Sequence, residues 1–364
     1  MRKENGFSKI LLVFIILVII FVVGIIGANT VYKSLIEPVQ SNSEKVTITI
    51  AGGSGISAIA TQLENEGIIK SAMAFKVYTK INSSTAMQAG KYELDKNMSV
   101  EEIIKVLSEG KVLDETVTIT FVEGKNMRKI AATIAEKTDN TAADVFNLLQ
   151  DEEYIDSLIN KYWFLDEDIK DEDIYYPLEG YLYPDTYTFA NKSVDVKTIF
   201  GKMLDKMDTV LTKYKSEIED SDYSIHELLS LASVVELEAG NKDDRAEVAG
   251  VFYNRLDNKM ALQSDVTTYY AVKIDMNERD LTNAELNSQN PYNTRSTTMA
   301  GKLPIGPICM ASESAIKAVI EPKETDAFFF VADKNGKVYF SKTNSEHEKK
   351  IKELKDSGLW YTYE

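Results

Sequence analysis

One long apolar run opens the hydrophobic pattern of the chain. Residues 10–28 carry no charge, and as a helix they span about 28 Å, close to the roughly 30 Å hydrocarbon core of a bilayer. The run predicts one membrane-spanning helix, followed by a polar linker at residues 29–43. The alternative is a cleaved signal peptide, whose apolar region is normally shorter. Arg2, Lys3 and Lys9 precede the run, and this positive charge predicts that residues 1–9 are cytoplasmic and the remainder extracytoplasmic.

Two similar stretches follow, at residues 46–63 and 117–134. Each begins with Val-Thr-Ile-Thr, turns at Gly53 or Gly124, and continues with apolar residues at helical spacing. This pattern predicts a duplicated unit of strand, turn and helix. Between the two copies, KYELD predicts a strand, and the segment from Ser99 to Gly110 predicts a capped helix.

The remaining pattern predicts a mixed body. Amphipathic helices are expected at residues 194–216, 225–239 and 244–257, and a hairpin at 328–341 turns at Asn335 and Gly336. Ser224 and Glu227 predict a capping box at the start of the second of these helices. A polar helix ends the chain. We therefore expect an α+β protein with a single transmembrane helix, a small α+β module at residues 44–115, and a larger mixed α+β domain at 116–364. The larger domain divides into a repeat-related part at 116–190 and a core at 191–364.

Composition limits the chemistry. The net charge of −16 repels phosphate backbones and makes nucleic acid an unsuitable partner. A single cysteine, Cys309, excludes an intrachain disulfide, and two histidines, His226 and His347, argue against a metal centre. We expect no metal and no cofactor, and assign Cys309 and His347 structural roles. Catalysis would fall to carboxylates, hydroxyls and amides.

Two acids stand near the end of the helix expected at residues 225–239. Glu236 continues a face that carries Leu229, Ala232 and Ser233, which predicts a partly desolvated carboxyl. Glu238 follows Leu231 and Val234 at helical spacing, so periodicity alone does not choose between the two acids. The negative end of the helix raises the pKa of either carboxyl. The alternative is a helix end with two solvated acids.

Further candidates combine aromatic and polar side chains that suit a sugar ligand, since aromatic faces stack on sugar rings and hydroxyls accept hydrogen bonds. The candidate substrate-binding residues come from three segments: Glu179, Tyr181 and Asp185; Gln263, Ser264 and Asp265; and Tyr292 and Asn293. For the first segment, around Pro184, the alternative is a core strand that ends in a proline turn.

The order of five motifs carries a stronger signal. They are LEGYLYPDTY, LASVVELEAG, NRLDNKMALQSDVTTYY, PYNT followed by KLPIGPI, and FFFVADKNGKVYFS followed by Glu346 and His347. Together they resemble the YceG-like, or MltG, endolytic murein transglycosylases. The resemblance extends from Val46 to the C-terminus, and it implies a LysM-like module at residues 44–115 and a transglycosylase domain at 116–364. The chain departs from the family pattern at residues 295–302, which form a longer link, and at Ile305.

The resemblance implies that the chain cleaves nascent peptidoglycan between N-acetylmuramic acid and N-acetylglucosamine and leaves a 1,6-anhydro end. It implies Glu236 as the catalytic glutamate, acting alone, because the 6-hydroxyl of the muramic acid supplies a tethered nucleophile. Expected partners are glycan strands, the cytoplasmic membrane through residues 10–28, and wall synthases such as penicillin-binding proteins. The rival hypothesis is a non-catalytic peptidoglycan-binding scaffold that recruits wall synthases.

Overall fold

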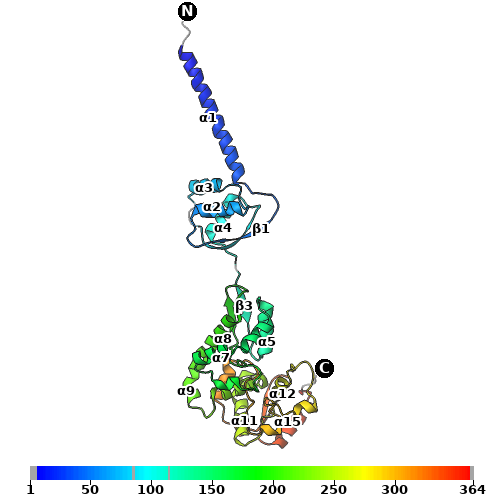
Figure 1. The fold of residues 1–364 in the computed structure, drawn as a ribbon. Helices are drawn as coiled ribbons and strands as arrows, with labels where there is room; N and C mark the ends of the chain where they lie inside the picture. The colour runs from blue at the N-terminus through cyan, green and yellow to red at the C-terminus, as the bar shows by residue number, and fades with distance from the viewer. Residues whose placement is uncertain (1–5, 84–86, 114, 361–364) are drawn as a thin grey trace, which may run out of the picture. The chain divides into compact units, whose positions relative to one another are not determined.

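The structure is a computed structural model that describes residues 6–83, 87–113 and 115–360. It separates into two compact units, Met1–Asp114 and Glu115–Glu364 (Figure 1). The sequence placed this division one residue later. Residues 1–5 of the predicted cytoplasmic segment lie outside the described part. Each unit has its own hydrophobic core.

The first unit begins with the helix α1, Gly6–Ile36. Its segment Leu11–Ile36 is long and apolar enough to cross a membrane, and an 18-residue stretch within it has a mean hydropathy of 3.4 and no buried residue. The helix runs eight residues past the predicted end at Ala28, into the predicted linker. No proline occurs before Pro38, and the intervening residues are compatible with a helix, so nothing stops it earlier.

The rest of the first unit is a small α+β module. The strands β1 (Lys45–Ile50) and β2 (Gly90–Asp95) pair antiparallel, and the helices α2 (Ile56–Asn65) and α3 (Ala72–Ile81) connect them. The helix α4 (Val100–Glu109) follows. Its predicted caps are confirmed, because Ser99 and Glu102 form a capping box and Gly110 adopts a φ of 65°.

The second unit opens with the second copy of the predicted repeat. The strand β3 (Val117–Thr120) leads through Gly124, with a φ of 73°, into α5 (Met127–Lys137). The duplicated strand, turn and helix are thus confirmed, although each strand pairs with a different partner. β3 pairs antiparallel with β4 (Thr186–Phe189). Between them lie α6 (Ala142–Leu149), α7 (Glu152–Lys161) and the short helix η1 (Glu167–Lys170).

Helices then build the body of the second unit. The helix α8 (Val196–Leu211) precedes α10 (Ile225–Glu238), which begins with the predicted capping box of Ser224 and Glu227. α10 packs against α11 (Arg245–Asp257), α12 (Asp265–Ala271) and α14 (Glu313–Ile320). Every residue from Leu228 to Val235 is buried, so α10 is the central helix of this core. Short helical segments complete the body: η2 (Thr212–Tyr214), α9 (Lys215–Glu219), η3 (Lys242–Asp244), α13 (Asn283–Leu286) and η4 (Thr297–Met299).

A hairpin and a helix end the described chain. β5 (Phe329–Ala332) and β6 (Val338–Ser341) pair antiparallel around Gly336, whose φ is 81°. This confirms the predicted hairpin. The helix α15 (Asn344–Asp356) packs against both strands.

Candidate active site

A polar cleft lies in the second unit, with a cavity volume of about 660 Å³. The end of α10, α11, the loop before α12, β5 and α15 all contribute to its wall. Its polar lining consists mainly of Glu238, Arg255, Gln263, Ser264, Asp265, Asp280, Arg295, Asn344 and His347. The cleft therefore gathers three of the predicted substrate-binding residues, Gln263, Ser264 and Asp265, around one of the two acids of α10.

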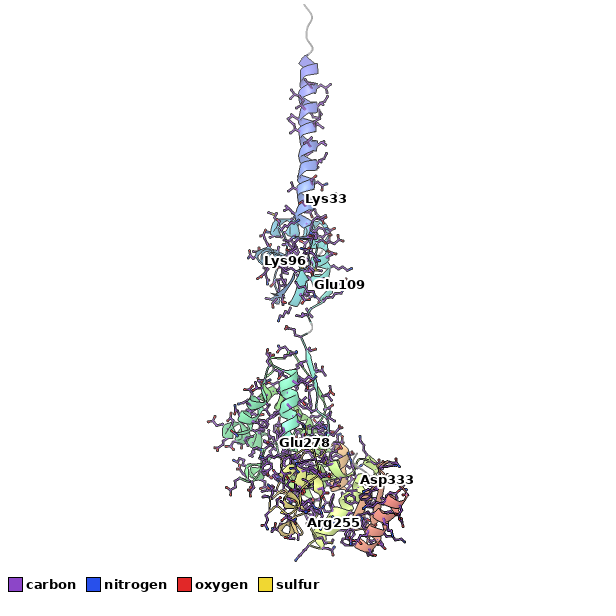
Figure 2. All side chains as sticks on the ribbon, turned by 90° about the vertical axis from the view of Figure 1, so that its right-hand side faces the viewer. Lys33, Lys96, Glu109, Arg255, Glu278 and Asp333 are labelled. Atoms are coloured by element: carbon purple, nitrogen blue, oxygen red, sulfur yellow. The ribbon has the colours of Figure 1, made fainter. Side chains whose placement is uncertain are left out.

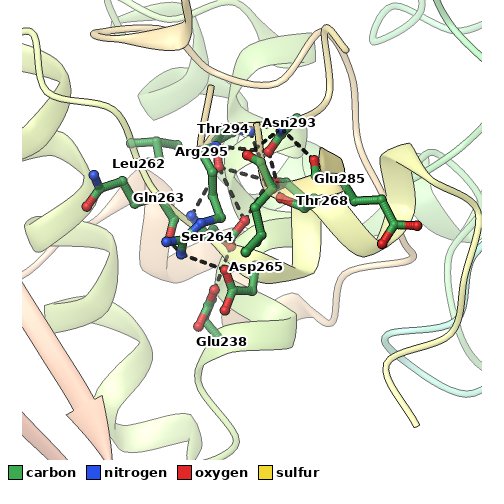
Figure 3. A network of polar contacts seen from close by, with 12 residues as sticks. Glu238, Leu262, Gln263, Ser264, Asp265, Thr268, Glu285, Asn293, Thr294 and Arg295 are labelled. Carbon is green, nitrogen blue, oxygen red and sulfur yellow. Dashed lines mark hydrogen bonds and ion pairs between the residues drawn. The ribbon is translucent and has the colours of Figure 1, made fainter. Parts of the chain in front are cut away.

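Glu238 is the last residue of α10 and faces this cleft. The Ser264 hydroxyl donates a hydrogen bond of 2.5 Å to its Oε1 atom (Figure 3). Burial raises the pKa of Glu238, and this effect outweighs the hydrogen bond from Ser264, which lowers the pKa. The nearby carboxylate of Asp265 raises it further. Glu238 therefore keeps its proton to a higher pH than an ordinary glutamate does, which is the direction of shift that a general acid needs.

Backbone hydrogen bonds fix the loop before α12, which carries Ser264. Gln263 adopts a φ of 53°, and its backbone amide donates to the carbonyl of Thr294 at 3.0 Å. The amide of Ser264 donates to the Thr294 hydroxyl at 3.1 Å, and Thr267 and Thr294 share a further hydrogen bond. Figure 3 shows these contacts converging on the segment that carries Ser264. The Ser264 hydroxyl is thus fixed in position before a ligand arrives.

Two arginines shape the cleft differently. Arg255, labelled in Figure 2, donates to the carbonyls of Phe328 at 2.6 Å and Leu262 at 2.5 Å, which tie α11 to the hairpin and the loop. Arg295 forms an ion pair of 2.6 Å with Asp265. This neutralises part of the charge of Asp265, while the carboxylate stays exposed on the cleft wall. The sequence analysis did not identify Arg255 as a candidate. It placed Arg295 in the longer link at residues 295–302 and assigned it no role.

His347 also lines the cleft, where the sequence had assigned it a structural role. Its ring stacks on Phe329 with 5.5 Å between centroids. Burial lowers its pKa, with a smaller contribution from the charge of Arg255. Among the described residues its buried Nδ1 atom has no hydrogen-bond partner. Its membership of the last motif, Glu346 and His347, was the signal in the sequence.

Glu236 has a different environment from Glu238. Its carboxyl accepts hydrogen bonds from Arg245 at 2.7 Å, from the Ser312 amide at 2.9 Å and from the Ser312 hydroxyl at 2.6 Å. The side chains of Glu236 and Arg245 are only 7% and 6% exposed, and Glu236 lines none of the cavities described for residues 115–360. These contacts join the end of α10 to the starts of α11 and α14. They describe a structural ion pair rather than an acid that faces a substrate.

Four predicted binding residues are buried in the core instead of lining the cleft. The Tyr181 hydroxyl bonds His226 at 2.7 Å, and Tyr292 accepts from the Tyr175 amide at 3.3 Å. Asn293 donates to the backbone carbonyl of Ser288 at 2.8 Å and accepts from Thr268 at 2.6 Å. The fourth buried residue is Glu179. The side chain of Asp185 pairs with Lys206 at 3.0 Å, away from the cleft.

Glu179 provides a test of this internal placement. It accepts from the Met127 amide at 2.9 Å and from the Tyr270 hydroxyl at 3.0 Å, and burial raises its pKa to about 7. The folded protein holds this proton more tightly than the unfolded chain, whose glutamate has a pKa near 4.5. The stability from Glu179 is therefore complete below about pH 4.5 and is lost as the pH rises to about 7.

We expect the free energy of unfolding to fall by about 2 kcal/mol between pH 5 and pH 7 as Glu179 ionises. Glu179→Gln should abolish this fall, because the amide does not ionise. Urea unfolding of the second unit at pH 5, 6 and 7 measures it. Asp185→Asn is the control, since a pKa lowered by Lys206 has no effect above pH 5. An equally steep pH dependence in Glu179→Gln would contradict the placement.

The fold and the cleft together describe an α+β protein with an apolar N-terminal helix. Its cleft holds one desolvated carboxylic acid, Glu238. Among the described residues, no group of three or more histidine, cysteine, aspartate or glutamate side chains could hold a metal ion.

Comparison with known proteins gives the family. The YceG-like family matches residues 48–353. An endolytic murein transglycosylase of Bacillus subtilis (strain 168) is 39% identical over 328 residues, covering 89% of each chain. One of Streptococcus pneumoniae serotype 2 (strain D39) is 36% identical over 354 residues, covering 92% of this chain and 63% of that protein. The crystal structure of a YceG-like protein from Listeria monocytogenes aligns with a TM-score of 0.60 at 37% identity, over 85% of this chain and 99% of that one. This chain therefore belongs to the YceG-like family.

Proposed function

We propose that this chain is an endolytic murein transglycosylase that uses Glu238 as its single acid and base. The observation that carries the proposal is the setting of Glu238, a desolvated carboxyl in a polar cleft, bonded to Ser264 at 2.5 Å. The relatives that match this chain over most of its length bear the name endolytic murein transglycosylase. Glu238 replaces Glu236 in this proposal because Glu236 is occupied by Arg245 and Ser312.

In the proposed reaction, protonated Glu238 donates its proton to the glycosidic oxygen between N-acetylmuramic acid and N-acetylglucosamine. The bond from the anomeric carbon to that oxygen breaks, and positive charge develops on the muramic acid ring. The 6-hydroxyl of the same ring attacks the anomeric carbon and gives its proton to the Glu238 carboxylate. The product carries a 1,6-anhydro end, and the acid is restored. No water is consumed, so a second carboxylate to activate water is unnecessary.

The cleft also offers groups that would stabilise the transition state. The exposed carboxylate of Asp265 and the side chains of Gln263 and Ser264 line the same cleft as Glu238. Negative charge and lone pairs favour a developing oxocarbenium ion. The ion pair with Arg295 partly neutralises the carboxylate of Asp265 and orients it. We assign these three residues to substrate and transition-state binding.

The product ends test the proposal. Full-length chain in detergent is incubated with glycan strands, and the fragments are weighed by mass spectrometry. Transglycosylation predicts anhydro ends, each 18 mass units lighter than a hydrolysed end. Reducing ends would contradict the reaction class. Binding to strands without any cleavage product would instead support the rival scaffold.

We further propose that α1 anchors the chain in the cell membrane, with residues 1–9 in the cytoplasm and the second unit outside. The apolar segment Leu11–Ile36 and the positive residues before it support this orientation. Deleting residues 1–28 should move the protein from the membrane fraction to the soluble fraction. Immunoblots of the two fractions measure this, and a truncated chain that still sediments with membranes would contradict the anchor.

The LysM-like nature of residues 44–115 remains a proposal. The order of strand, two helices and antiparallel strand from Lys45 to Asp95 is compatible with a small carbohydrate-binding module. A wall synthase as a protein partner likewise remains a prediction from the sequence resemblance.

A further inference from the structure

A second cavity of about 350 Å³ adjoins the cleft in the second unit. The two share Val266, Tyr269 and Met276 in their walls. Leu237 lines the second cavity, whereas the next residue, Glu238, lines the cleft. A ligand seated at Glu238 can therefore extend past the end of α10 into this second cavity.

The lining of the second cavity combines apolar walls with positive charge. Leu237, Ile274 and Ile308 supply the apolar surface. Lys129 lines the rim but pairs with Asp275. Lys125 lines it as well, and its side chain is exposed. Within residues 115–360 the structure gives Lys125 no carboxylate partner.

The backbone around Lys125 is fixed. The amide of Gly124 donates to the carbonyl of Met310 at 2.8 Å, and the amide of Met310 donates back to the carbonyl of Lys125 at 3.0 Å. Gly124 itself has a φ of 73°, in the left-handed region. The turn therefore fixes the backbone of Lys125 at the wall of the second cavity, in a chain whose net charge is −16. A local cation in such a chain favours an anionic group on the ligand.

We propose that this second cavity binds the acidic peptide carried by a sugar next to the bond that is cleaved, with Lys125 pairing one of its carboxylates. The inference rests on the proposed function. A neutral sugar would need no cation, whereas a short peptide offers both carboxylates for Lys125 and small apolar groups for Leu237 and Ile308. The cavity would thus distinguish strands that carry peptides from strands without them.

The test is the charge reversal Lys125→Glu, since an exposed side chain tolerates this change without loss of fold. The measurement is kcat/KM of the full-length chain for peptide-bearing strands and for strands of equal length with their peptides removed. We expect kcat/KM for peptide-bearing strands, divided by kcat/KM for peptide-free strands, to fall about tenfold. The reason is that glutamate at position 125 repels the peptide carboxylate that lysine attracts. The fall should shrink in high salt. Lys192→Glu, another exposed lysine that lines neither cavity, is the matched control and should leave the ratio unchanged.

Binding to the Glu238→Gln chain supplies a second measurement if peptide-free strands are cut too slowly. Calorimetry with both oligomers should show Lys125→Glu weakening only the peptide-bearing one. Equal loss for both oligomers, or no loss for either, would overturn the peptide site while leaving the proposed reaction intact. Absence of anhydro product from the unsubstituted chain on every strand would instead contradict the proposed function.

Discussion

Glu238→Gln should lower the rate of anhydro-end formation by about a thousandfold. The amide keeps the shape and can still accept the hydrogen bond from Ser264, but it cannot donate a proton to the glycosidic oxygen, a step typically worth 10²- to 10⁴-fold. The measurement is the initial rate of product formation by the full-length chain at pH 6, 7 and 8. The rate of the unsubstituted chain should fall as the pH rises through the raised pKa of Glu238, since the acid must be protonated.

The thermal midpoint of Glu238→Gln is the control for folding and should stay within a few degrees. Glu236→Gln is the matched substitution two residues away on the same helix. Its folded fraction should keep a rate within about threefold of the unsubstituted chain, since Glu236 does not line the cleft that holds Glu238. A fully folded Glu236→Gln chain that has lost activity a thousandfold would restore Glu236 as the catalytic acid.

Glu236→Gln should instead lower the free energy of unfolding of the second unit by about 3 kcal/mol. Removing one partner of a buried ion pair leaves the other charge without compensation, and Arg245 is 6% exposed. The loss would also weaken the connection of α10 to Ser312 at the start of α14. Urea unfolding followed by circular dichroism measures it.

A paired substitution separates charge from packing. Replacing Glu236 and Arg245 together by methionine should cost less than the sum of the two single changes, because no uncompensated charge remains. Additive costs would contradict the account of Glu236 and Arg245 as one structural unit.

Local signals in the sequence predicted much of the fold. The capping box at Ser224 and Glu227, and the Asn335 and Gly336 turn, each depend on a few neighbouring residues, so the helix α10 and the terminal hairpin could be placed in advance. The end of α1 was predicted too early, because polar residues after Ala28 were taken for a linker. The α3 helix, between the two strands of the first module, was not predicted.

The choice between Glu236 and Glu238 could not be made from periodicity. That method assumes a helix with one buried face, but α10 is surrounded by α11, α12 and α14. With nearly all sides buried, an apolar stripe does not show which direction opens onto solvent. Arg245 follows Glu236 by nine residues, across the turn to α11, so its pairing depends on tertiary structure.

The sequence also could not tell which of the candidate binding residues line the cleft and which are buried in the core. Gln263 and Ser264 lie in the loop before α12 and Asp265 is the first residue of that helix, and polar residues in such a place commonly border a site. Tyr181 and Tyr292 have large aromatic surfaces, and both are buried in the core. Composition cannot tell an aromatic ring that stacks on a sugar from one that packs inside the protein.

The most direct measurement is a crystal structure of the Glu238→Gln chain with a bound peptidoglycan oligomer. The account predicts the glycosidic oxygen within about 3 Å of the side chain at position 238, with Glu236 still paired to Arg245. An oligomer whose glycosidic oxygen lies against Glu236, with the Arg245 pair opened, would contradict it.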